Sequence, residues 1–225
     1  MRMLITTLTI AFLASFISVC FAKEEHFCSN QILAKETNTG FTWTLTSRLG
    51  EILHNAEQRY GKRDTSWTIL GIEFTNQNQP EIWYPSPSDG RKHVIIQLTK
   101  KASQDKKSAL YQLSHEVIHL LSPAGRDGSS VFEEGLAVYF SISNMQAMNY
   151  DISERYISGK KYLQAYKLID NLYKNFDNAE ARIKQLRSQV KRTRDITPQQ
   201  FSTAFGGLNK KYAKLLATKY SAWKF

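Results

Sequence analysis

Two histidines and a glutamate stand close together in the segment "SHEVIHLL", at His115, Glu116 and His119. On a helix, residues four apart project from the same face, so both imidazoles are placed to bind one Zn²⁺ ion. Glu116 follows the first histidine directly and could take a proton from a zinc-bound water that attacks a carbonyl. The HExxH pattern therefore predicts hydrolytic zinc chemistry. The alternative is a partly exposed helix with two ordinary histidines.

A catalytic zinc needs a third protein ligand, and the segment "SVFEEGLAVYF" offers two adjacent candidates, Glu133 and Glu134. A carboxylate among such apolar residues is costly to bury unless it is paired or binds a metal. The loop "SPAGRDGSS" can fold this second helix back across the first, and Gly135 would let the two backbones approach closely. The alternative is an acidic first turn that the helix dipole favours.

The two motifs "HEVIH" and "EEGLAVY" together resemble the gluzincin zinc metallopeptidases, in particular small exported bacterial peptidases of this zincin-like superfamily. The resemblance covers about residues 93 to 140. It implies that His115, His119 and Glu134 bind one catalytic Zn²⁺, and that Glu116 is the general base. It also implies that Glu133 is the neighbour of the third ligand and that the substrate is a peptide or protein.

Two features depart from this resemblance. Only fourteen residues separate His119 from Glu134, which implies a compact loop. Relatives that carry an aspartate four residues after the ligand glutamate use it as a partner near the metal, whereas here that position is Val138. Metal-bound imidazoles usually have such a partner, so the group that orients the histidines is unidentified at this point.

Enzymes of this type also use a tyrosine, histidine or arginine to stabilise the oxyanion. Tyr156 begins "YISG", which resembles the Y-x-x-G motif of some gluzincins, and it is the candidate for this role. Tyr162 and Tyr166 fall on the apolar stripe of the next helix, so both are predicted to be core residues.

The elements that position these residues follow from hydrophobic spacing. Residues 45–60 are predicted to form an amphipathic helix that ends at Gly61. The runs "SWTILGIEF", "EIWYP" and "HVIIQLT" predict a small sheet between Trp67 and Thr99. From about Ser103 onward the pattern is helical. If the fold is zincin-like, the strand "HVIIQL" is the edge along which an extended substrate lies.

The helix that carries the motif has an apolar stripe that anchors it in the core, formed by Leu110, Leu113, Val117 and Leu120. A second helix is predicted to begin near Val131. The expected class is α+β, a zincin-like fold with a small mixed sheet, an active-site helix and a mainly helical C-terminal lobe. We expect one domain over residues 23–225, with the α/β lobe ending near 121 and the helical lobe starting near 131.

The first 22 residues place Arg2 before an unbroken apolar run that ends near the small residue Ala22. This layout predicts a secretory signal peptide and therefore a periplasmic or secreted protein. The alternative is an uncleaved membrane anchor, because the run is almost long enough to span a bilayer. Cleavage would leave Cys28 as a single thiol, so no internal disulfide is expected.

The chain carries 30 Lys and Arg against 20 Asp and Glu, a formal net charge of +10. Such an excess favours acidic peptides or an anionic envelope surface as partners. The alternative is a solvated basic surface that has no partner. The lysines are spread along the chain without a nucleic-acid-binding motif, so nucleic acid is not expected. Two functions follow as hypotheses: an exported zinc metallopeptidase, or a basic envelope-binding protein with a structural or catalytically decayed zinc site.

Overall fold

The computed structural model describes residues 36–37, 40–41, 45–85, 90–123, 125 and 128–224. The predicted signal peptide, residues 1–22, and Cys28 lie outside the described residues, so both expectations stay predictions. Among the helices of the described part, none has the length and apolar character needed to cross a membrane.

A small three-stranded sheet follows the first helix. Its strands are β3 (Thr68–Thr75), β4 (Glu81–Trp83) and β5 (His93–Thr99), in the order β3-β5-β4. β5 runs parallel to β3 and antiparallel to β4, so the predicted mixed sheet is confirmed. A separate two-stranded ribbon joins β1 (Glu36–Thr37) to β2 (Gly40–Phe41).

The expectation that the strand "HVIIQL" is an edge strand is wrong, because β5 is the central strand. Its main chain is hydrogen-bonded to β3 on one side and to β4 on the other, so it has no edge to offer a substrate. The edge strand beside the motif helix is β4. Only three residues long, β4 carries a weak sequence signal, and its place in the sheet depends on pairing with a strand ten residues further along the chain.

The described residues include seven α-helices. They are α2 (Leu45–Tyr60), α3 (Lys106–Leu120), α4 (Val131–Ala147), α5 (Lys160–Asn175), α6 (Ala179–Ser188), α7 (Pro198–Ala204) and α8 (Lys210–Leu216). Four short 3₁₀ turns also lie in this part of the chain: η1 (Lys100–Gln104), η3 (Glu154–Tyr156), η4 (Thr193–Asp195) and η5 (Tyr220–Ala222). The predicted α+β class is thereby confirmed.

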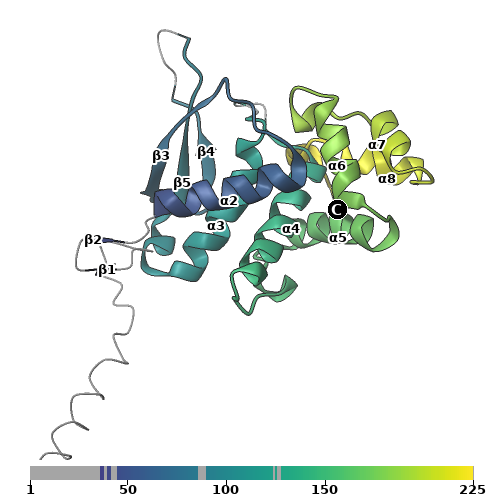
Figure 1. Cartoon of the computed structure of the whole chain (residues 1–225). Helices are drawn as coiled ribbons and strands as arrows, with labels where there is room; N and C mark the ends of the chain where they lie inside the picture. The colour runs from purple at the N-terminus through teal and green to yellow at the C-terminus, as the bar shows by residue number, and fades with distance from the viewer. Residues whose placement is uncertain are drawn as a thin grey trace, which may run out of the picture.

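Figure 1 shows the sheet and α2 at one end of the molecule and α6, α7 and α8 at the other. α3 and α4 lie between them, and α4 packs against both α3 and α5. The four residues of the predicted α3 stripe are all buried, none more than 1% exposed: Leu110, Leu113, Val117 and Leu120. The apolar side of α3 is therefore fixed in the core, as the spacing predicts.

Side-chain caps fix where the two central helices start. The Asp105 carboxylate accepts hydrogen bonds from the backbone N–H groups of Lys107 and Ser108, at 3.1 and 3.2 Å, and begins α3. Ser130 Oγ accepts from the Glu133 N–H at 3.2 Å and begins α4. Because Ser130 sets the first turn of α4, it also sets the direction of the two glutamates that follow.

The expectation that Gly135 brings α4 close to α3 is wrong. A Cβ at Gly135 would overlap the Ala165 carbonyl and lie 2.8 Å from Ile169 Cγ1, and both of these residues belong to α5. Successive helical residues are rotated by about 100°, so the residue after Glu134 faces a different neighbour from Glu134 itself. α3 and α4 are instead joined in the core by a hydrogen bond from Asn144 Nδ2 to Ser114 Oγ, at 3.0 Å.

Candidate metal centre

Three predicted ligands converge where α3 and α4 cross. His115 and His119 come from α3, one turn apart, and Glu134 comes from the first turn of α4. The two Nε2 atoms lie 3.4 Å apart. Glu134 Oε2 lies 3.3 Å from His115 Nε2, and Glu134 Oε1 lies 3.7 Å from His119 Nε2.

This group could hold a metal ion. One donor atom from each residue lies within 4.8 Å of the others, and His115 and Glu134 are each only 8% exposed. Glu134 Oε2 is buried and has no hydrogen-bond partner among the described residues. This oxygen lies 3.3 Å from His115 Nε2, and the other oxygen of the same carboxylate lies 3.7 Å from His119 Nε2. A buried carboxylate that faces two imidazole nitrogens in this way fits a metal ligand, because burial of its charge is otherwise costly.

Neighbouring side chains hold the ligands in place. Ser129 Oγ, in the loop before α4, donates a hydrogen bond to Glu134 Oε1. Glu133 Oε1 lies 3.1 Å from His119 Nδ1, on the side of the ring away from His115. Glu133 therefore has the position of the orienting group that the sequence left unidentified. The acid pair was visible in the sequence, but the division of roles between its members was not.

The histidines and glutamates of this group attract one another electrostatically, and the attraction shifts the pKa values of His119 and Glu134. Burial lowers the pKa of His119, but the Glu134 and Glu133 carboxylates outweigh it and raise the pKa to about 10. Burial raises the pKa of Glu134, but His119, His115 and Ser129 outweigh it and lower the pKa to about 2. The attraction between opposite charges holds these side chains together.

Glu116 is almost fully buried, at 2% exposed, and lies beside the three converging residues without joining them. Burial raises the pKa of its carboxyl group, and the two histidines offset part of that increase. It lines a cavity of about 190 Å³ together with His115, His119 and Glu134. The β4 region, residues 80–82 and 84, also lines this smaller cavity.

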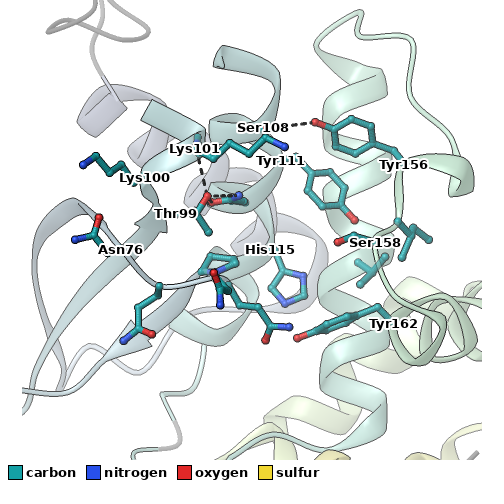
Figure 2. A pocket seen from close by; sticks show the side chains of 18 residues that line it. Asn76, Thr99, Lys100, Lys101, Ser108, Tyr111, His115, Tyr156, Ser158 and Tyr162 are labelled. Carbon is teal, nitrogen blue, oxygen red and sulfur yellow. Dashed lines mark hydrogen bonds between the residues drawn. The ribbon is translucent and has the colours of Figure 1, made fainter. Parts of the chain in front are cut away.

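A larger cavity of about 570 Å³ adjoins the smaller one. The two cavities share Pro80, His115 and Tyr162, so the candidate metal centre stands at their junction. Figure 2 shows the larger cavity, with His115 and Tyr162 at its base and Tyr156 at its upper rim.

Tyr156, the predicted oxyanion donor, lies in the wall of the larger cavity but not of the smaller one. Its hydroxyl lies 3.2 Å from Ser108 Oγ, and its ring packs edge-on against Tyr111. Tyr162, predicted to be a core residue, packs against the core and also lines both cavities. The centre of its ring lies 5.8 Å from that of His115.

The C-terminal segment covers the other side of Tyr162. Ser130 and Lys219 form a β-bridge, and the Tyr220 N–H donates to the Ser129 carbonyl at 2.9 Å. The Tyr220 ring packs 5.3 Å from that of Tyr162. No motif marks the segment from Thr218 to Trp223, and it reaches Tyr162 because the chain returns to the loop before α4.

Comparisons of the chain with protein-family models, with curated proteins and with solved structures find no match. The case for a function therefore depends on the site itself.

Proposed function

We propose that the chain is an exported zinc metallopeptidase of the gluzincin type, with a zincin-like fold. The observation that carries the proposal is the convergence of His115, His119 and Glu134. Two atoms bound to one tetrahedral zinc at ~2.0–2.2 Å lie ~3.3–3.6 Å apart. The two imidazole nitrogens, 3.4 Å apart, and His115 Nε2 with Glu134 Oε2, 3.3 Å apart, have this spacing. The other Glu134 oxygen, Oε1, lies 3.7 Å from His119 Nε2, close to the same spacing.

In the proposed reaction, bound Zn²⁺ would polarise the scissile carbonyl and make a water more acidic. Glu116 takes the proton from that water and passes it to the leaving amine, and its closed surroundings suit a carboxylate that exchanges protons. Glu133 accepts a hydrogen bond from His119 Nδ1 and so keeps His119 Nε2 directed at the centre. The Tyr162 hydroxyl is the proposed donor to the oxyanion.

The substrate chain is proposed to lie along β4. This strand pairs with β5 on one side, and no strand of the described residues pairs with its other side. Residues 80–82 and 84 also line the smaller cavity, together with Glu116. An extended peptide could therefore add to the sheet by main-chain hydrogen bonds while its scissile bond lies over the metal centre.

Metal analysis tests the proposal directly. Purified protein is expected to hold about one zinc per chain, and His115→Ala is expected to lose it, because the site then lacks one of its three ligands. His54→Ala is the matched control, since His54 is an exposed helical histidine on α2. Protein that stays metal-free when offered zinc contradicts the proposal.

The variant Glu116→Gln distinguishes the proposed enzyme from the alternative function. The alternative is a basic envelope-binding protein with a structural or decayed zinc site. In an enzyme, the change abolishes chelator-sensitive cleavage of a peptide library and leaves zinc content and the circular-dichroism spectrum unchanged, because the amide cannot accept the proton. In a binding protein, no chelator-sensitive cleavage is present to lose.

A further inference from the structure

The larger cavity opens next to the candidate metal centre and is built from segments far apart in the chain. One wall is the run Asn76–Gln79 between β3 and β4, a second is the start of η1 with Lys100 and Lys101, and a third comes from α3 and η3. Its volume of about 570 Å³ lies in the range of ordinary ligand pockets. It is therefore large enough to receive a substrate side chain.

Part of the cavity wall is braced by its own hydrogen bonds. The Gln112 side-chain oxygen accepts from the Thr99 N–H at 3.0 Å, and Gln112 Nε2 donates to Thr99 Oγ1 at 3.0 Å. The hydroxyl groups of Ser108 and Tyr156 are hydrogen-bonded to each other. These groups are already paired and fix the shape of the wall.

Other donors in the wall have no such partner. The Tyr111 hydroxyl makes no hydrogen bond with a described residue, and Figure 2 shows it directed into the cavity on the side of Ser158. Lys101 extends over the cavity toward Tyr111, whereas Lys100 points to the side of Asn76 (Figure 2). Neither lysine forms an ion pair with a described residue. The wall thus offers two cations and an unpaired hydroxyl, beside the side-chain amides of residues 76–79, which can donate or accept.

The two cavities differ in charge. The described lining of the larger cavity contains two lysines and no aspartate or glutamate. The smaller cavity is lined by four glutamates, Glu81, Glu116, Glu133 and Glu134. A carboxylate on the substrate would meet two cations and no acidic side chain in the larger cavity.

We propose that the larger cavity is the subsite for an acidic side chain, aspartate or glutamate, of the peptide substrate, at a position close to the bond that is cleaved. This inference rests on the proposed peptidase function. Lys101 is the specificity-determining cation, and Tyr111 supplies a hydrogen bond to the same carboxylate. Because His115 and Tyr162 belong to both cavities, a side chain in the larger one positions its own backbone at the metal centre.

The test uses the zinc-loaded full chain and a library of end-blocked peptides whose cleavage sites are mapped by mass spectrometry. Asp or Glu is expected to be enriched at one position next to the cleaved bond. For a matched pair of peptides that differ only by Glu or Gln at that position, Lys101→Glu should reduce kcat/KM for the Glu peptide by about fivefold relative to the Gln peptide. This is roughly the effect of reversing one solvent-accessible charge.

Lys211→Glu is the matched control, because it makes the same change of net charge at an exposed position on α8, away from the cavity. Lys211→Glu should leave the ratio of kcat/KM for the Glu peptide to kcat/KM for the Gln peptide unchanged. A second readout does not depend on turnover: the Glu peptide should bind Glu116→Gln protein more tightly than the Gln peptide does, and Lys101→Glu in that background should remove the difference.

The possible failures are distinguishable. Chelator-sensitive cleavage without an acidic preference, or with a preference that Lys101→Glu does not change, overturns the acidic subsite and leaves the peptidase function standing. The absence of chelator-sensitive cleavage of any peptide in the library overturns the peptidase function, and the subsite is overturned with it.

Discussion

Glu133 and Glu134 are adjacent in the chain, yet their side chains reach different nitrogens. Glu134 faces His115 Nε2 and His119 Nε2, the two atoms that point to the centre of the site. Glu133 contacts His119 Nδ1, on the outer side of the ring. Glu134 at the start of α4 thus faces the candidate metal centre, and its neighbour Glu133 lies where it could orient His119. Glu133 therefore provides the acid that the sequence lacks at Val138.

Glu133→Gln should weaken zinc binding by roughly 10- to 100-fold, the usual cost of losing an orienting partner of a ligand histidine. Glu134→Gln should weaken binding further, because it removes the anionic ligand itself. Competition with a chromophoric chelator measures both affinities, and circular dichroism checks the fold. Equal losses in the two variants would contradict this division of roles.

The tyrosine candidates can be separated by removal of single hydroxyl groups. Tyr162→Phe should lower kcat on a cleaved peptide by about 100-fold with little change in KM, the size expected when one oxyanion donor is lost. Tyr156→Phe should change kcat by no more than about twofold, because the Tyr156 hydroxyl is paired with Ser108. The opposite order in steady-state kinetics would assign the role to Tyr156.

At the scale of elements, α4 determines whether a site exists at all. It packs against α3 through Glu134 and the Asn144 to Ser114 hydrogen bond, and against α5 through Gly135. The Ser130 cap and the β-bridge to Lys219 fix its first turn. A displacement of α4 would therefore move Glu134 away from the histidines.

Gly135→Ala should lower the free energy of unfolding by about 1–3 kcal/mol, because the new methyl group meets the α5 backbone at Ala165 and cannot be accommodated without a shift. Gly50→Ala on α2 is the control. A Cβ there meets nothing within 4 Å, so the same substitution should raise stability by about 0.5–1 kcal/mol. Urea denaturation measures both, and equal effects would contradict the close approach of α4 and α5.

At the scale of the whole molecule, the site lies where the sheet-bearing part meets the helical part. α3 is the last helix of the first part and α4 is the first of the second (Figure 1). Each supplies side chains to the candidate metal centre. The molecule is basic overall, yet four glutamates gather in the smaller cavity. The larger cavity has two lysines and no acidic residue in its described lining, and this charge arrangement underlies the proposed subsite.

The sequence by itself determined the features that depend on local geometry. The four-residue spacing of His115 and His119 places both on one face of α3, and the apolar stripe on the same helix is buried as expected. The helix ending before Gly61 and the start of α4 at Val131 were also predictable, because caps and periodicity act over a few residues.

Only the tertiary structure decided which neighbour each of these residues meets. The separate roles of Glu133 and Glu134, the contact of Gly135 with α5 rather than α3, and the central position of β5 all depend on segments distant in the chain. The same holds for Tyr162 at the junction of the two cavities. Periodicity shows that a face is buried, but the packing partner is selected by the fit of side chains across the whole core.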